Sequence, residues 1–339
     1  MTGGTTPEHP EEHSERAPAD ERSQRVGFAR PSSHFSPASI SRVLLIANPA
    51  SRVGRLRYPL AVEAFRRAKV QCEAVLTERV GHGAEIAAER AASFDAVFTL
   101  GGDGTAMEVV GCLSGSGLPV GILPGGTGNL IARTLGIPLD VRRAVPALLG
   151  GRVAQVDLGR LDAAHGGRRF AFAAGVGIDA AMIERTPSAL KRRIGVLAYV
   201  IAAAGAVMRR DEFRVRVIAD GHADERAASA VMVANFGAVL NDLLTLGPGI
   251  AHDDGHLDVC VFSPTTFLDA VRVVWRMLRK DFTTDRCMLY VPGRQIRVEI
   301  DPPHHFQADG ELLGETPFEV TVEPLAARML VPERRRRPR

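Results

Sequence analysis

The chain has 339 residues, of which 45% are hydrophobic and 24% charged, and its formal net charge is +3. This composition predicts a folded protein, and the length suffices for two hydrophobic cores of ordinary domain size. So small a net charge, without alternating basic and aromatic residues, argues against a nucleic-acid-binding protein. The four cysteines form no CxxC pair, which predicts reduced, buried thiols in a cytoplasmic protein.

Residues 1–40 are rich in Glu, His, Ser, Pro and Arg and contain no apolar segment of the kind found in a signal peptide. Their composition predicts a disordered tail. The basic residues 333–339 at the other end are also predicted to be disordered, and they would add attraction to anionic lipid if they lie at a membrane surface.

Predicted strands alternate with predicted helices between residues 41 and 152. We expect strands at 42–47, 72–76, 95–100 and 119–123, and helices near 56–69, 82–93, 105–114 and 128–135. This alternation predicts an open parallel sheet with helices on both faces, a Rossmann-like α/β domain.

Two glycine-rich turns follow consecutive strands of this domain. They read Gly101-Gly102-Asp103-Gly104-Thr105 and Pro124-Gly125-Gly126-Thr127-Gly128-Asn129. Glycines let the backbone approach a ligand closely, and amides at the start of a helix favour an anion. Both turns are expected at the carboxyl edge of the sheet, where open α/β sheets bind ligands. An Asp in the first turn favours a phosphate site that also holds a cation or a transferable proton, although neither turn is a Walker A loop.

Residues 153–324 have a different character. Short strand-like runs are expected at 153–160, 168–174, 213–219, 227–236, 257–262, 295–300 and 318–322. Their spacing predicts a mainly antiparallel β-sandwich with a few inserted helices. One helix is expected at 191–210, with an apolar centre shorter than the ~20 residues that a spanning helix needs. It is either buried between the domains or lies against anionic headgroups. A second, amphipathic helix at 266–282 is expected to pack on the core.

The ordered motifs resemble those of the diacylglycerol kinase catalytic domain family, over about residues 42–332. That family groups bacterial lipid kinases with sphingosine and ceramide kinases. Besides the two glycine turns, the resemblance rests on these segments: Asn48-Pro49-Ala50-Ser51, Thr77-Glu78, 156–159, 175–180, Gly247-Pro248, 254–258 and 307–311. It implies that residues 325–332 return to the first domain.

The resemblance implies an ATP-dependent lipid kinase. Such an enzyme transfers the γ-phosphoryl group to a hydroxyl of diacylglycerol, a sphingoid base or a related lipid at the membrane surface, with Mg²⁺ as cofactor. The implied nucleotide contacts are Asn48, Ser51, Arg52, Thr77, Gly101, Gly102, Asp103, Gly104, Thr105, Glu108, Gly126, Thr127 and Asn129. Two departures stand out, namely Leu130 where the family often has Asp and Arg52 where Gly commonly follows Ser.

Glu311 is the implied general base by resemblance to bacterial members, and Asp103 is its rival by resemblance to sphingosine-kinase-like members. The sequence leaves this choice open. Asp254, with the carbonyls of Ala251 and His256, is the implied site of a second, structural Mg²⁺. The structural alternatives are a hairpin-turn carboxylate for Glu311 and an Asx-type turn for Asp254.

Two other functions stay open. An NAD kinase shares the Gly-Gly-Asp-Gly-Thr turn and the two-domain plan, but the second glycine turn and the late Asp309-Gly310-Glu311 argue against it. A catalytically silent nucleotide- or lipid-binding regulator is disfavoured because Asp103, Thr105 and Glu311 are all present. The oligomeric state is also open, with a homodimer as one option.

Overall fold

The computed structural model describes residues 40–50, 52–126, 128–177, 212–239, 244–245, 247 and 249–333. The predicted helix at 191–210 lies outside the described residues. So do the predicted tails, except for Ile40 and Glu333. In the described part of the chain, no helix combines the length and the apolar character needed to cross a bilayer.

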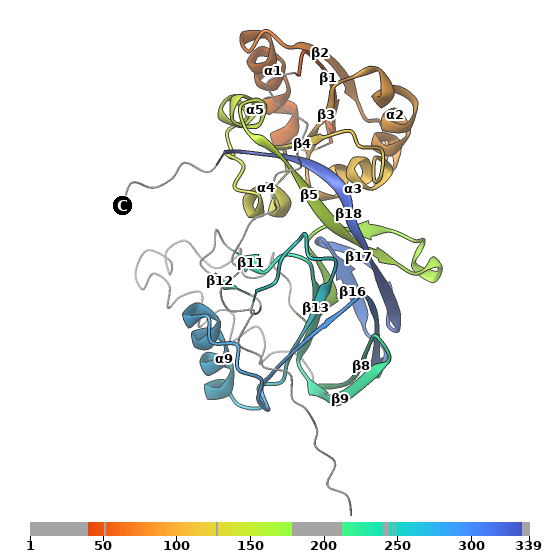
Figure 1. Cartoon of the computed structure of the whole chain (residues 1–339), viewed down its shortest axis with the longest axis vertical. Helices are drawn as coiled ribbons and strands as arrows, with labels where there is room; N and C mark the ends of the chain where they lie inside the picture. Colours follow the sequence, from red (N-terminus) through yellow and green to blue (C-terminus); the bar gives the residue numbers. More distant parts are fainter. Residues whose placement is uncertain are drawn as a thin grey trace, which may run out of the picture.

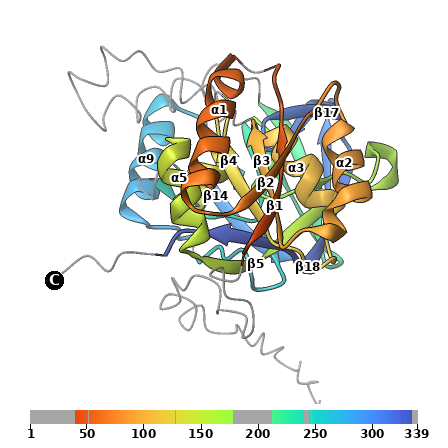
Figure 2. The ribbon, with the colours of Figure 1, turned by 90° about the horizontal axis from the view of Figure 1, so that it is seen from above.

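The first part of the chain alternates strands and helices as predicted. The elements are β1 (Arg42–Ala47), α1 (Arg52–Arg67), β2 (Gln71–Leu76), α2 (His82–Arg90), β3 (Ala96–Gly101), α3 (Asp103–Cys112), β4 (Val120–Pro124), α4 (Leu130–Thr134) and α5 (Val141–Leu149). The strands pair in parallel in the order β2-β1-β3-β4. Figure 2 shows α1 and α5 on one side of this sheet and α2 and α3 on the other.

Burial on both faces explains the composition of these strands. Every residue of β3 is buried, as is every residue of β1 after Arg42, so the strands read as continuous apolar runs. Helix α5 was not predicted. Asp140 caps it by accepting a hydrogen bond from the amide of Arg142 at 3.0 Å, but Pro146 within the helix weakens the helical pattern in the sequence.

The second part is rich in β-structure. Its elements are β5 (Arg152–Leu161), β6 (Arg169–Phe170), β7 (Ala173–Val176), β8 (Phe213–Ala219), β9 (His222–Ala228), β10 (Ala230–Ala234), β11 (Ala238–Val239), β12 (Leu244–Thr245), β13 (Leu257–Phe262), α9 (Phe267–Arg279), β14 (Met288–Gly293), β15 (Gln295–Asp301), β16 (His305–Ala308), β17 (Glu311–Glu315) and β18 (Phe318–Val331). The predicted strands 168–174 and 227–236 are each divided between two strands, and β11, β12, β14, β16 and β17 were not predicted.

Two sheets form the sandwich. One continues the parallel sheet through β18, β15, β8 and β9, and the other has the order β14-β13-β10-β7-β16-β17. Alternate side chains from both sheets, such as Val215, Val298, Val259 and Phe306, fill the core between them. The predicted fold class, an α/β part with a mainly parallel sheet followed by an antiparallel β-sandwich, is confirmed (Figure 1).

Strand β18 runs from the sandwich to the parallel sheet. It pairs with β5 along its length, and Met329 pairs in parallel with Val120 of β4. A bulge interrupts the β18–β5 pairing near Leu325, where φ is 51°. The buried carboxylate of Asp157 accepts hydrogen bonds from the amides of Leu325 (2.6 Å) and Gly255 (2.7 Å). Asp157 therefore ties the bulge to the loop before β13.

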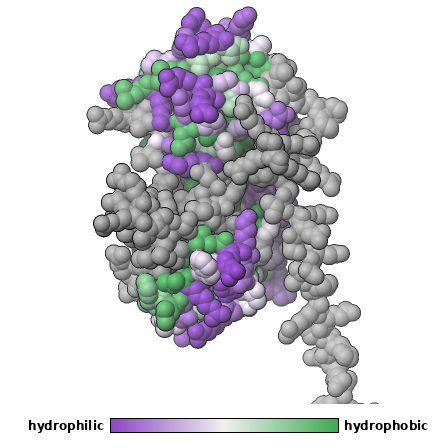
Figure 3. Space-filling view, turned by 90° about the vertical axis from the view of Figure 1, so that its left-hand side faces the viewer, coloured by the Kyte–Doolittle hydropathy of each residue, from purple (hydrophilic) through white to green (hydrophobic). Residues whose placement is uncertain are grey.

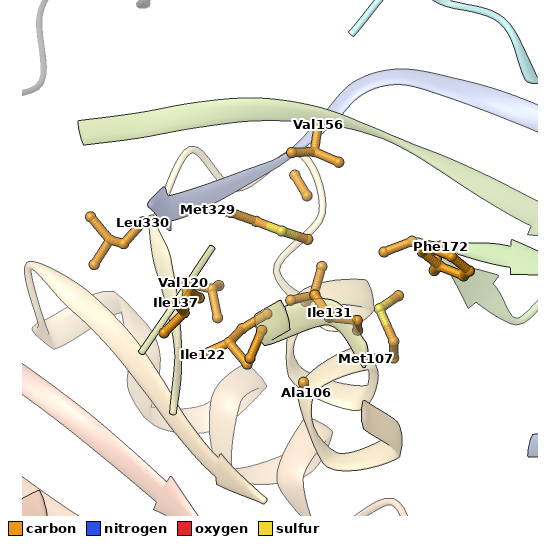
Figure 4. Packing of buried hydrophobic residues seen from close by; sticks show 14 of the residues in the cluster. Ala106, Met107, Val120, Ile122, Ile131, Ile137, Val156, Phe172, Met329 and Leu330 are labelled. Carbon is orange, nitrogen blue, oxygen red and sulfur yellow. The ribbon is translucent and has the colours of Figure 1, made fainter. Parts of the chain in front are cut away.

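Helix α4, which follows the second glycine turn, is fixed by apolar contacts. Figure 4 shows Ile131 of α4 among Ile122 of β4, Met107 of α3 and Met329 of β18. All four side chains belong to the same buried cluster. The turn before α4 is therefore held between the parallel sheet and the strand that returns from the sandwich.

Candidate functional site

The two glycine turns pack directly on each other. The amide of Gly125 donates to the carbonyl of Gly101 at 2.8 Å. A Cβ on Gly125 would lie 2.8 Å from the Gly101 nitrogen, and one on Gly126 would lie 2.6 Å from the Gly102 Cα. Neither approach is possible for a residue with a side chain, so these glycines serve the packing of one turn on the other.

Gly102 differs because its missing side chain leaves open space. The nearest atom to a Cβ there would be the Gly126 Cα at 3.8 Å, an ordinary contact. Gly102 is also the N-cap of α3 and offers no side chain to the first amides of that helix. A helix start of this kind suits phosphate. Gly102 therefore leaves room for an anion beside the start of α3, as the sequence predicted for this turn.

Asp103 is the first residue of α3, and its carboxylate reaches the start of α4. Its Oδ2 accepts from the amide of Leu130 at 3.0 Å, and its Oδ1 accepts from the amide of Ile131 at 2.9 Å. Burial raises the pKa of Asp103, and the amides of Ile131 and Leu130 act against that rise. Each oxygen keeps a further lone pair, so Asp103 joins the two turns and can still face a cation.

Asn129 uses its side chain inside the second turn. It is buried with φ of 50°, its Oδ1 accepts from the Gly126 amide at 2.8 Å, and its Nδ2 donates to the Gly126 carbonyl at 2.8 Å. The structure thus gives Asn129 a role in the shape of the turn. Direct contact with a nucleotide stays a prediction, as it does for Ser51 and Thr127 and for the Arg52 side chain, which all lie outside the described residues.

The other predicted nucleotide residues border the first turn. Asn48 donates through Nδ2 to the hydroxyl of the buried Thr105 at 3.1 Å. The backbone amide of the buried Thr77 donates a hydrogen bond to the carbonyl of Ala47 at 2.9 Å. Glu108 accepts from the amide of Gly81 at 2.9 Å, which fixes the turn before α2. Asn48 and Thr105 are therefore brought together, while the carboxylate of Glu108 points to a backbone amide.

Glu311 begins β17, in the other sheet, yet it reaches α3. Its Oε1 lies so close to Gly104 that a Cβ on Gly104 would overlap it. Its Oε2 accepts from a guanidinium nitrogen of Arg168 at 2.8 Å. A small pocket lies at this junction, and its lining residues are Gly104, Met107, Arg168, Arg169, Ala308, Asp309, Glu311 and Leu313.

Asp309 lies two residues before Glu311, and its hydrogen bonds hold the turn between β16 and β17. Its buried carboxylate accepts from the amides of Ala171 (2.7 Å), Phe172 (2.8 Å) and Ala173 (3.1 Å). Burial raises its pKa to about 6, the three amides act against the rise, and the nearby Asp103 adds to it. Asp309 and Gly310 both have positive φ in the β16–β17 turn. Because Asp309 pins this turn, the Glu311 carboxylate is directed toward α3.

The predicted metal loop contains an Asx-type turn. Asp254 Oδ1 accepts from the amide of His256 at 3.0 Å, which is the structural alternative stated for this residue. Within the described residues, no group of three His, Cys, Asp or Glu side chains is arranged to hold a metal ion. Asp253 and Asp254 add to the raised pKa of Asp157, which burial causes in the first place. A Mg²⁺ held by Asp254 and the carbonyls of Ala251 and His256 stays a prediction.

Arg168, Asp309 and Asp157 were not among the predicted site residues. Arg168 is separated from Glu311 by 143 positions, so no local pattern links them. Asp309 stands inside the Asp-Gly-Glu motif, and its position before a glycine was a signal for a left-handed turn. Asp157 had a signal as well, since a carboxylate in an apolar strand is seldom buried without partners.

Two family models match the chain. Residues 42–161 match the diacylglycerol kinase catalytic domain, and residues 173–331 match the YegS C-terminal NAD kinase beta sandwich-like domain. Together they cover both sheets of the sandwich apart from β6.

Several proteins are similar to this chain in sequence. A diacylglycerol kinase of Bacillus subtilis (strain 168) is 27% identical over 286 residues, which cover 83% of this chain and 93% of that protein. A diacylglycerol kinase of Mycobacterium tuberculosis is 28% identical over 251 residues, 73% of this chain and 80% of that protein. An uncharacterized protein of Synechocystis sp. is 31% identical over 241 residues, or 70% of this chain, but the match spans 54% of that relative's length.

The fold is also similar to that of a diacylglycerol kinase from Bacillus anthracis str. Sterne, seen in a crystal structure. The TM-score is 0.66 at 24% sequence identity, with 86% of this chain and 97% of that chain covered. At this identity the likeness concerns the fold alone.

Proposed function

We propose that this chain, which belongs to the diacylglycerol kinase catalytic domain family, transfers the γ-phosphoryl group of ATP to a lipid hydroxyl. The acceptor is diacylglycerol, a sphingoid base or a related lipid. The observation that carries the proposal is the position of Glu311 against Gly104, next to Asp103 at the start of α3. A carboxylate from the sandwich thereby meets the glycine turns of the parallel sheet, which is the arrangement that phosphoryl transfer between two bound substrates needs.

The glycine turns would hold the phosphates of ATP. The open side of Gly102 and the first turn of α3 offer backbone donors, and the N-cap glycine places no side chain over them. Asn48 and Thr105 lie beside these amides, joined by their own hydrogen bond. Positioning by backbone donors suits this reaction because most of its catalysis is alignment and charge stabilisation.

Asp103 fits the requirements of a Mg²⁺ ligand. It is a largely desolvated carboxylate that accepts from the amides of Leu130 and Ile131, one on each oxygen, and its own backbone amide also lies close to it. A carboxylate has about four lone-pair sites, so it can still bind a cation. Mg²⁺ usually binds one or two carboxylates together with substrate phosphates and waters. When bound, the ion would neutralise charge on the phosphates. Asp103 would hold it there while fixing α4 against α3.

Glu311 would act on the acceptor hydroxyl. As the lipid oxygen forms its bond to the γ-phosphorus and the bond from that phosphorus to the β-phosphate oxygen breaks, the hydroxyl proton passes to the Glu311 carboxylate. Arg168, bound to the other oxygen of that carboxylate, would keep Glu311 in place. Asp309, with its three amide contacts, fixes the turn that carries Glu311.

The test is phosphorylation of a total lipid extract with γ-labelled ATP and Mg²⁺, followed by mass spectrometry of the labelled product. A labelled lipid that is absent with the Glu311→Gln variant supports the proposal and identifies the acceptor. NAD serves as a parallel acceptor. Label in NAD alone, or in no acceptor under any detergent condition, would overturn the assignment of a lipid kinase.

A further inference from the structure

Helix α9 exposes large apolar side chains although it packs on the core. Phe267 is 49% exposed, Leu268 77% and Trp275 53%. The opposite side of the helix is buried through Ala270, Val273, Val274 and Met277, and the last three belong to the larger core cluster. The predicted packing of this amphipathic helix on the core thus accounts for one side of it. The exposed side carries apolar surface that the fold does not require.

The helix is fixed without help from its exposed residues. Thr266 and Asp269 form a reciprocal cap at its start, with the Thr266 hydroxyl accepting from the Asp269 amide at 3.1 Å. Near its end, the buried Arg276 pairs with Asp285 at 2.7 Å and contacts the carbonyl of Thr283. Substitution of an exposed residue should therefore leave the helix in place.

Cations surround the exposed apolar side chains. Arg272, Arg279 and Lys280 are exposed, and the Arg279 guanidinium lies 6.0 Å from the centroid of the Trp275 ring. Among the described residues, none of these three has a carboxylate within ion-pair distance. The acidic side chains nearby are already paired, Asp281 with Arg276 and Asp269 with Arg286. Figure 3 shows hydrophobic and hydrophilic residues adjoining at the lower end of the molecule, over α9.

We propose that this side of α9, defined by Phe267, Leu268, Arg272, Trp275, Arg279 and Lys280, docks on the surface of an anionic lipid bilayer. Aromatic and aliphatic side chains insert at the boundary between headgroups and acyl chains, and arginine and lysine bind the anionic headgroups. The proposal rests on the proposed function, since a lipid acceptor has to be drawn from a membrane.

A second copy of the chain fits this surface less well than lipid does. A two-fold interface would place Arg272, Arg279 and Lys280 close to the same residues of the other copy. Like charges at an interface are unfavourable, whereas an anionic bilayer complements them.

Trp275 makes the test specific, because the chain contains one tryptophan. The full-length protein is mixed with phosphatidylcholine vesicles, with or without phosphatidylglycerol. We expect Trp275 emission to shift to the blue with the anionic vesicles, and brominated acyl chains to quench it. Sedimentation with anionic vesicles without these changes would overturn the proposal, as would absence of binding. A blue shift that follows protein concentration without lipid would instead indicate a dimer and overturn it too.

Matched pairs of variants distinguish the contribution of this surface to vesicle binding from the effect of the same substitution elsewhere on the protein. Leu268→Ser is paired with Leu56→Ser on α1, where Leu56 is 69% exposed. Lys280→Glu is paired with Lys69→Glu, because both lysines follow a helix and have nearly equal positive φ, 58° and 59°. Each α9 variant should weaken binding to anionic vesicles about tenfold, while the paired variant changes it less than about twofold. Equal effects within both pairs would contradict a role for α9.

Activity on a monomeric short-chain diacylglycerol, assayed without vesicles, distinguishes this inference from the proposed function. The α9 variants should retain that activity. If the wild type phosphorylates the short-chain lipid but Trp275 does not respond to vesicles, the docking surface is refuted and the kinase remains. If Trp275 responds and no lipid is phosphorylated, the membrane surface stands and the kinase assignment fails.

Discussion

The Glu311 carboxylate lies against the Cα of Gly104, in the space that a Cβ on that residue would fill. One residue begins a strand of the sandwich and the other lies in the first turn of α3. Their contact joins the two parts of the molecule at the pocket. It also explains why the third glycine of the first turn is needed, since Gly104 makes room for a side chain from the other sheet.

Gly104→Ala should therefore impair activity more than stability. The methyl group would push aside the end of a flexible, partly exposed Glu311 side chain, and alanine gains up to about 1 kcal/mol in helix propensity. We expect kcat to fall at least ~100-fold with an unchanged melting temperature. Gly111→Ala, on the same helix, is the control, because its Cβ would have its nearest contacts at 3.8 Å. Equal activity of both variants would show that the position of Glu311 is unimportant.

Asp103→Asn and Glu311→Gln should each lower kcat at least ~100-fold, but only the first should reduce stability. Asn cannot accept from both the Leu130 and Ile131 amides through separate oxygens, and an unsatisfied amide costs about 1–3 kcal/mol. Glu311→Gln loses an ion pair that is nearly half exposed, worth at most ~1 kcal/mol. Kinetics and thermal unfolding measured on both variants test this difference. Near-normal turnover in both would refute the mechanism.

Arg168→Gln tests whether this arginine positions Glu311. Loss of the 2.8 Å hydrogen bond should lower kcat about tenfold and leave KM for ATP unchanged, because the contact is to the proposed base. Arg168→Lys should restore part of the activity through its remaining charge. A rise in KM for ATP at constant kcat would instead assign Arg168 to nucleotide binding.

Asp309 should make stability depend on pH. Its folded pKa of about 6 lies above the ordinary value, so the folded protein binds the proton more tightly than the unfolded chain. The stability gained by this is fully present below about pH 4 and is lost as the pH rises through about 6. The free energy of unfolding of the wild type, relative to Asp309→Asn, should fall by about 3 kcal/mol over this range.

Denaturant unfolding of both proteins between about pH 4 and pH 7 measures this difference. The pKa values of Asp103 and Asp157 are also raised, but these groups are present in both proteins and largely cancel. A difference that stays constant, or that grows with pH, would show that the Asp309 pKa is not raised in the folded state.

Prediction from the sequence failed where the pattern was weak or the contact joined residues far apart in the chain. Strands β16 and β17 are short and flank the Asp309-Gly310 turn, so their alternation extends over few residues. The structure shows the side chains of Asn129 and Glu108 bound to the backbone amides of Gly126 and Gly81, and contact of either residue with a nucleotide stays a prediction. A polar side chain beside a glycine turn satisfies its nearest amide as readily as a ligand, and the sequence does not distinguish these cases.

The sequence by itself determined the fold class, the two glycine turns after β3 and β4, and the late Asp-Gly-Glu turn. These features depend on hydrophobic periodicity and turn chemistry, which act between neighbours along the chain. Only the tertiary structure decided that Glu311 meets Gly104, that Arg168 binds Glu311 across 143 positions, and that Asp309 pins the hairpin to Ala171–Ala173. Those contacts depend on the pairing of β7 with β16 and on the route of β18 between the sheets, which no local pattern encodes.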